Sequence, residues 1–344
     1  WSSEEEEGAE SPPQRAWRGV PAEPASACAP GALVHVLSGD ALRAVAAQVA
    51  EDDLCCFRST CRVFRDHAPR PRRKTRSSML CSVARTRWAW AQPNFRLSDE
   101  RMCALAAAAG ALDTLAHLRD ELGLRWAAST CEAAAAAGHV HIIRYARARG
   151  CAWSATTAVR AAGNGHIAAL AHLSAHACPR DARACEAAAR GGHLHALQWL
   201  RLNEYAWAVG TSVAAAHQGH LEVLRWALAH GCPAGPSACD AAAAGGHVPV
   251  LALLRARGCA WGPSTCAAAA RAGHLDVLRW LRAEGCAWDG STCCAASAGA
   301  HLPVLMWARA EGCDWDSQVC LAAAAGGDMA TLRWARAQGC GEWT

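Results

Sequence analysis

The 344-residue chain has few aromatic residues other than tryptophan, with 3 Phe and 2 Tyr against 16 Trp. Such a bias indicates one structural position that the same residue type fills many times. Long apolar runs are also missing, since no uninterrupted stretch approaches the ~18 residues of a membrane-spanning helix. The longest candidate, Cys293–Ala308, contains His301 and Pro303. We therefore expect no membrane partner.

Strong charge of either sign is absent as well. Charged residues make up 19% of the chain, apolar residues 52%, and the formal net charge is +4. This composition is typical of a globular protein and excludes a largely disordered chain. A charge of +4 spread over this length does not predict a nucleic-acid partner.

The first residues lack the basic and apolar segments of a secretory signal. The 20 cysteines are therefore expected to be reduced thiols rather than a disulfide framework. We expect a cytoplasmic protein. The basic run Arg70–Arg76 leaves nuclear import as an alternative to a solvated linker, which we favour because the run is short and contains Pro71.

Motifs of catalysis and metal binding are missing. The chain has no Gly-rich phosphate loop, Gly-x-Ser-x-Gly, His-Glu-x-x-His or Cys-x-x-Cys motif, and its carboxylates are scattered. His139 with His141, and His193 with His195, invite a metal hypothesis, as do Cys55, Cys56, Cys61 and His67. Zinc needs four convergent ligands, and His139 and His193 belong to a repeated turn. We expect no enzyme activity, no cofactor and no metal.

Most of the chain is a repeat with a period of 27 residues, and a Gly-His pair marks six of its units. A fixed period of 20–50 residues is the signature of a solenoid. The first unit carries one extra residue between Gly110 and Gly138, and the last two units replace Gly-His by Ala300-His301 and Gly327-Asp328. The other pairs begin at Gly138, Gly165, Gly192, Gly219, Gly246 and Gly273.

Each unit is expected to hold two short helices. In the clearest one, Ser264 or Thr265 is expected to cap the first helix, which an Ala run continues and Gly273 ends at a positive φ. The second helix is expected from about Leu275 to Ala283, before Gly285. The sequence predicts no strand.

Three residue types recur as columns, which we interpret as packing positions. The alternative for Trp is an aromatic stripe that binds ligands, whereas we expect inter-repeat packing. The Leu/Ile column consists of Ile143, Leu170, Leu197, Leu224, Leu251, Leu278, Leu305 and Leu332. Trp occupies a column on the second helix (Trp199, Trp226, Trp280, Trp307, Trp334) and a column in the turn (Trp126, Trp153, Trp207, Trp261, Trp288, Trp315). Cys occupies two columns, to which Cys266 and Cys286 belong.

The repeated Thr-Cys, Ala run, Gly-His-Leu and Gly-Cys elements resemble the ankyrin repeat over residues 97–340. This resemblance implies an all-α, ankyrin-like solenoid that binds protein partners. The unit is 27 residues long where ankyrin has about 33, and the opening motif lacks Pro-Leu-His. We therefore expect the family's β-hairpin finger to be reduced to a turn, with the first helices as the contact surface.

Two slots of the first helix vary between units and lie one turn apart, so they share a face. We expect this face to be concave and to bind the target, although drift at solvated positions is the alternative. The candidate target-binding residues are Glu132, Glu186, Arg190, His217, Asp240 and Arg271.

A segment before the repeats resembles an F-box. Its apolar residues, with Asp53 and Arg62, fall in the family's order, although Ser38 replaces the usual Pro. The resemblance implies docking of a Skp-type adaptor; the alternative is an N-terminal cap on the solenoid. The candidate adaptor-binding residues are Leu37, Leu42, Val45, Val49, Leu54, Cys61 and Phe64.

Five segments follow from these patterns: a disordered acidic and Pro-rich segment at 1–30, the F-box-like motif at 31–68, a basic linker at 69–77, a capping helix at 78–96 and nine ankyrin-like units at 97–344. By resemblance, the protein is expected to be a monomeric substrate receptor of a cullin–RING ubiquitin ligase, with an unidentified target. The alternative is a scaffold with no ubiquitin role.

Overall fold

The computed structural model describes residues 82, 83, 86 and 97–340. The chain divides into two compact units, 1–75 and 76–344, and all described residues belong to the second. The segments predicted at 1–30, 31–68 and 69–77 therefore lie outside the described residues, as does nearly all of the predicted capping helix.

Nine helix pairs make up residues 97–340 of the second compact unit, and no strand occurs among them. The described residues 97–340 thus form an all-α solenoid of stacked helix pairs, as predicted. The first helices are α5 (Asp99–Ala108), α7 (Ala128–Ala136), α9 (Ala155–Gly163), α11 (Arg183–Arg190), α13 (Val209–His217), α15 (Pro236–Gly245), α17 (Pro263–Ala272), α19 (Gly290–Ala298) and α21 (Ser317–Gly326). The second helices are α6 (Leu112–Ala116), which runs into the π-helix η2 (His117–Glu121), α8 (Val140–Ala148), α10 (Ile167–Ala175), α12 (Leu194–Leu202), α14 (Leu221–Ala229), α16 (Val248–Ala256), α18 (Leu275–Ala283), α20 (Leu302–Ala310) and α22 (Met329–Ala337).

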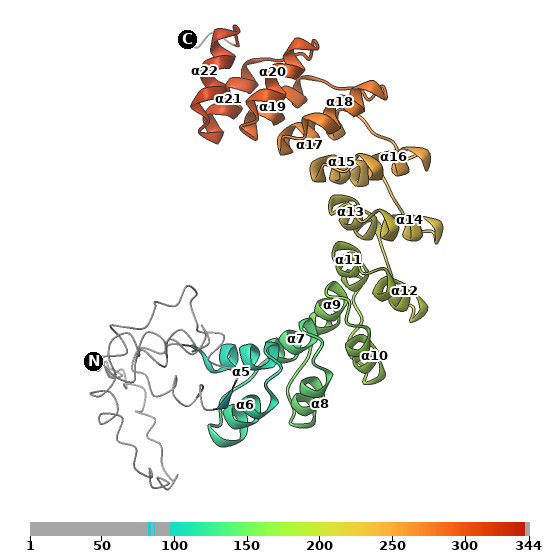
Figure 1. The fold of residues 1–344 in the computed structure, drawn as a ribbon, viewed down its shortest axis with the longest axis vertical. Helices are drawn as coiled ribbons and strands as arrows, with labels where there is room; N and C mark the ends of the chain where they lie inside the picture. The colour runs from blue at the N-terminus through green and yellow to red at the C-terminus, as the bar shows by residue number, and fades with distance from the viewer. Residues whose placement is uncertain (1–81, 84–85, 87–96, 341–344) are drawn as a thin grey trace, which may run out of the picture. The chain divides into compact units, whose positions relative to one another are not determined.

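The first helices form the inner row of the repeat stack and the second helices the outer row (Figure 1). Each first helix from α7 to α19 packs against the first helices of both neighbouring units; α15, for example, contacts α13 and α17. Small residues permit this close approach, since Ala269 and Ala270 of α17 are fully buried. The core therefore runs along the stack, and each unit completes the core of its neighbours.

The second helix of the clearest unit matches its prediction, since α18 spans Leu275–Ala283. Gly273 and Gly285, which flank it, have φ of +80° and +78°, in the region that only glycine visits without strain. The connection to α19 contains no strand, so the expected turn replaces a hairpin finger.

The predicted caps Ser264 and Thr265 are wrong by two or three residues. The N-cap of α17 is Gly262, and Pro263 occupies the first helical position, which suits its fixed φ and missing N–H. Thr265 instead lies buried in the first turn, where its Oγ1 accepts a hydrogen bond from the Gly262 N–H at 3.5 Å. It stabilises the start of the helix from inside the core.

The extra residue of the first unit is absorbed by the π-helix η2. There the Leu122 N–H donates to the carbonyl of His117, five residues earlier, at 3.1 Å. A single π turn accommodates one additional residue without breaking a helix. Leu115 and Leu124 on either side are both buried, so the packing positions stay in register.

The repeated columns are packing positions, as predicted. From Ile143 to Leu305 every member of the Leu column is fully buried, whereas Leu332 of the last unit is half-buried. The turn Trp of one unit meets the helix Trp of the next edge to face: for Trp261 and Trp280 the ring centroids lie 5.6 Å apart at 82°. An arginine from the preceding helix covers the turn Trp, as Arg282 covers Trp288 at 4.3 Å.

The cysteine columns are free thiols, buried except for the half-buried Cys259, as predicted. The neighbouring thiol of Cys286 in the same unit, together with burial, raises the pKa of Cys266. Burial also raises the pKa of Cys185 to about 11 and that of Cys103 to about 12. These side chains act as small hydrophobic groups rather than as nucleophiles.

The Gly-His pairs join consecutive units. The His166 Nε2–H donates to the carbonyl of Ala136 in the preceding unit at 3.1 Å, and the same bond links His274 to Ala244. The His ring also covers the glycine of the preceding unit: a Cβ at Gly273 would lie 2.6 Å from the ring of His301. The interpretation of His139 and His193 as structural turn residues is consistent with this geometry.

Replacing Gly273 with alanine should lower the free energy of unfolding more than the same change at Gly327. Both glycines have positive φ, +80° and +70°, but a Cβ at Gly327 would meet nothing within 4 Å. Left-handed strain costs about 1–2 kcal/mol at either site, whereas the clash with the His301 ring penalises only Gly273→Ala. Urea unfolding measures both losses; equal losses would contradict the interlock.

Replacing Leu278 with alanine should cost about 2–5 kcal/mol, because it leaves a cavity in the core. Leu332 fills the same slot in the last unit but is only half-buried, so Leu332→Ala serves as the matched control and should cost less. Cys266→Ala removes a single sulfur atom and should also cost less than Leu278→Ala. A Leu278→Ala loss no larger than these would contradict the assignment of the Leu column to the core.

Candidate interaction surface

The variable slots of the first helices lie on the inner row of the stack. Residues in the first slot, such as Glu132, Glu186 and Asp240, are half-buried. The charged residues of the second slot, Arg190 and Arg271, are exposed, as is His217. The predicted target-binding residues thus divide into a half-buried and an exposed group.

Two predicted residues, Glu132 and Asp240, contact the start of the next first helix. A Glu132 carboxylate oxygen accepts hydrogen bonds from the hydroxyls of Ser154 at 2.9 Å and Thr156 at 2.8 Å. Asp240 accepts from Ser264 at 3.1 Å and Thr265 at 2.6 Å. These carboxylates satisfy hydroxyl groups between units, so much of their hydrogen-bonding capacity is already used.

Glu186 behaves differently, because Gly210 occupies the position where Thr156 and Ser264 carry hydroxyls, and Thr211, the counterpart of Thr265, makes no hydrogen bond. Gly210 faces it instead: a Cβ there would lie 2.9 Å from Oε2 of Glu186. Glu186 therefore pairs with Arg190 one turn along its own helix, at 2.5 Å. The pair is partly exposed, with 33% of the Glu186 side chain and 58% of the Arg190 side chain open to solvent.

A pocket of about 330 Å³ lies between α11 and α13 on this surface. It brings together three of the predicted residues, Glu186, Arg190 and His217, whereas Glu132, Asp240 and Arg271 do not line it. Its wall thus offers a carboxylate, a guanidinium and an imidazole. Such a set recognises polar and charged side chains of a partner rather than an apolar ligand.

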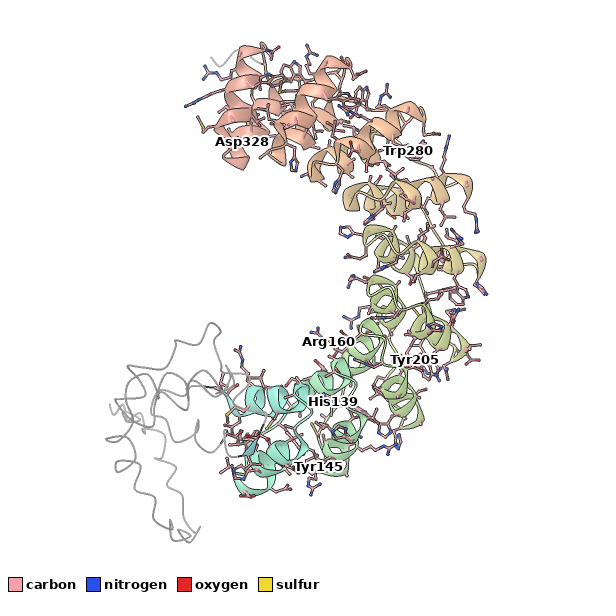
Figure 2. The ribbon with its side chains drawn as sticks, in the orientation of Figure 1. His139, Tyr145, Arg160, Tyr205, Trp280 and Asp328 are labelled. Atoms are coloured by element: carbon pink, nitrogen blue, oxygen red, sulfur yellow. The ribbon has the colours of Figure 1, made fainter. Side chains whose placement is uncertain are left out.

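Sequence reasoning missed Arg160 of α9. Its slot holds Leu105 in the first unit and Ala in the remaining units, for example Ala133, Ala187 and Ala268, and Arg160 is exposed. It extends from the inner row of the stack (Figure 2). The signal was one charged residue in an otherwise apolar column, which was missed because only the variable slots were compared.

The seven candidate adaptor-binding residues, from Leu37 to Phe64, lie outside the described residues. Within residues 97–340 no three His, Cys, Asp or Glu side chains gather in a way that could hold a metal ion. No helix in that range has the length and apolar character needed to cross a membrane.

Comparisons with known proteins locate a structural resemblance but no close relative. No protein-family model matches the chain, and no curated protein matches it. Among solved structures, the chain is similar to the crystal structure of the human ASB11 ankyrin repeat domain at 18% identity and a TM-score of 0.38. That match covers 45% of this chain and 83% of the ASB11 domain.

Exchanging Glu186 and Arg190 tests the pocket. The variant Glu186→Arg/Arg190→Glu keeps an ion pair on α11 but reverses the charge pattern that a partner meets, so capture of a target identified by proximity labelling should fall about tenfold. The matched control exchanges Glu222 and Arg225, which pair at 3.6 Å on α14 of the outer row, and should leave capture unchanged. Equal capture by both variants would exclude this pocket from the target site.

Proposed function

We propose that the chain is a non-enzymatic protein-binding protein whose target docks on the inner row of first helices. The observation that carries this proposal is the pocket between α11 and α13, where Glu186, Arg190 and His217 meet at an exposed surface. Each unit contacts only its neighbours, so side chains on the inner row can change without loss of the core.

The partner class follows from the form of this surface. Side chains capable of contact recur on successive first helices, from Arg160 on α9 to Arg271 on α17. An extended row of separate polar and charged groups suits a protein partner, whereas a small molecule needs an enclosing, mostly apolar cavity. Mixed charges of this kind set specificity and association rate more than total affinity.

We further propose that the F-box-like motif docks a Skp-type adaptor, which would make the protein a substrate receptor of a cullin–RING ubiquitin ligase. The support is the sequence pattern Leu37, Leu42, Val45, Val49, Leu54, Cys61 and Phe64. Another enzyme of the ligase would then modify the target held by the repeats. The alternative remains a repeat scaffold that takes no part in ubiquitination.

Replacing Leu37 and Leu42 with aspartate separates these two functions. If the motif docks the adaptor, two charges in its apolar interface should abolish co-purification with the adaptor, while urea unfolding of the repeats stays unchanged. The control is Leu202→Asp, because Leu202 of α12 is 83% exposed and its charge should have no effect on adaptor binding. If wild-type protein never binds the adaptor, or the double variant still does, the scaffold function stands alone.

A further inference from the structure

The contact between turn Trp and helix Trp is not made in every unit: Trp126 meets Tyr145, and Arg180 and Ala234 stand in place of the turn Trp. Beside Trp153 it is the helix residue that differs. Trp207, Trp261, Trp288 and Trp315 each meet the indole of the next unit edge to face, with centroids 5.6–5.9 Å apart. At the equivalent place beside Trp153, position 172 holds histidine instead of tryptophan. An imidazole lacks the six-membered ring of an indole, so space for one such ring remains.

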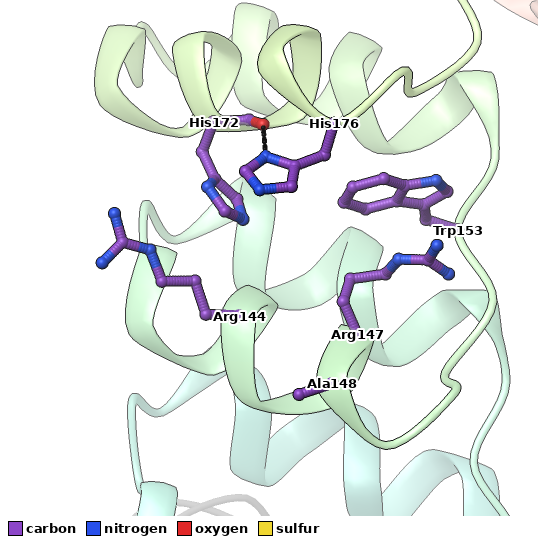
Figure 3. A pocket seen from close by; sticks show the side chains of 6 residues that line it. All are labelled: Arg144, Arg147, Ala148, Trp153, His172 and His176. Carbon is purple, nitrogen blue, oxygen red and sulfur yellow. Dashed lines mark hydrogen bonds between the residues drawn. The ribbon is translucent and has the colours of Figure 1, made fainter.

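A pocket of about 630 Å³ opens at this place. Arg144, Arg147 and Ala148 of α8 line one side, and Trp153 of the connecting turn closes the end (Figure 3). His172 of α10 and His176, which follows the last residue of that helix, line the other side. No carboxylate is among the lining residues. The pocket is therefore cationic and carries one aromatic wall.

Contacts within the repeat fix two of the basic side chains, Arg147 and His176. The Arg147 guanidinium lies over the Trp153 ring at 4.1 Å, and its Nη1–H donates to the carbonyl of Cys151 at 2.7 Å. The His176 Nδ1–H donates to the carbonyl of His172 at 2.8 Å, so Nε2 of His176 donates to an anion when the ring is protonated. Burial, with His176 and Arg144 nearby, lowers the pKa of His172, so an anion here would favour its protonated form.

The chain contains its own comparison for this site. Two units further on, the equivalent slots form a pocket of about 430 Å³. There Gln198 stands for Arg144, Leu202 for Ala148 and Trp226 for His172, while Trp207 and His230 keep the positions of Trp153 and His176. All three differences make the pocket at α8 and α10 wider or more basic than its counterpart.

We propose that this pocket binds the phosphotyrosine side chain of a partner protein. The aryl ring takes the place of the missing indole, edge to face on Trp153, and the phosphate meets Arg144, His172 and His176. A phosphate dianion offers three strong acceptor oxygens to these donors, more than a carboxylate does. This site lies on the outer row and does not depend on the target surface or on the adaptor.

Titration calorimetry of the full chain with N-acetyl-phosphotyrosine amide tests the proposal. Phosphotyrosine should bind roughly 2- to 10-fold more tightly than phosphoserine or inorganic phosphate, because only it supplies the ring; the tyrosine amide should not bind. Arg144→Gln, the residue of the counterpart pocket, should weaken binding about 10-fold or more. The control Arg333→Gln changes the same slot on α22, where position 333 is exposed, and should leave the affinity unchanged.

His172→Trp is the second variant, because it restores the residue that the equivalent slot holds in other units. It should fill the pocket, abolish binding and leave the helical circular dichroism spectrum intact. Three outcomes would overturn the proposal: no binding of phosphotyrosine to the wild type, equal affinity for inorganic phosphate and phosphotyrosine, or unchanged binding in Arg144→Gln. Loss of target capture by inner-row variants would not affect it.

Discussion

The contact between each histidine ring and the glycine of the preceding unit fixes the stacking of the repeats. The ring leaves no room for a Cβ, and its Nε2–H bonds a carbonyl 30 residues earlier, as in His247 to His217. A slip of one residue would break both contacts at once. The unit that lacks this glycine is followed by a unit that lacks the histidine. Ala300 adopts a φ of +59° in the glycine slot, and Asp328 stands where the next histidine would be. The Asp328 side chain instead caps its own helix by accepting from the Ala330 N–H.

The sequence predicts those parts of the fold that one residue decides alone. Gly273 and Gly285 mark the ends of helices because only glycine takes positive φ cheaply, and the bounds of α18 follow. The start of α17 was mispredicted because two groups can begin a helix there. Thr265 has a capping hydroxyl, but Pro263 at the first position and the burial of Thr265 favour Gly262. The π turn that absorbs the extra residue depends on tertiary packing, which a local sequence pattern does not predict.

The candidate target surface shows what variation in a column can and cannot reveal. Glu132, Glu186 and Asp240 share a slot, yet only Glu186 reaches the pocket. The difference lies in the next unit: Ser154 and Thr156 bind Glu132, Ser264 and Thr265 bind Asp240, and Gly210 offers Glu186 nothing. Whether a variable position is available to a partner therefore depends also on the residues 22–25 positions later, which the structure brings beside it.

The same principle governs both faces of the stack. Because each unit contacts only its neighbours, a substitution in one column changes one local site and leaves the rest of the core intact. On the inner row, Gly210 replaces a residue with a hydroxyl group, and Glu186 pairs with Arg190 instead. On the outer row, His172 in place of tryptophan opens a basic pocket beside Trp153. In both cases the departure from the repeat, rather than the repeat itself, creates the chemistry available to a partner.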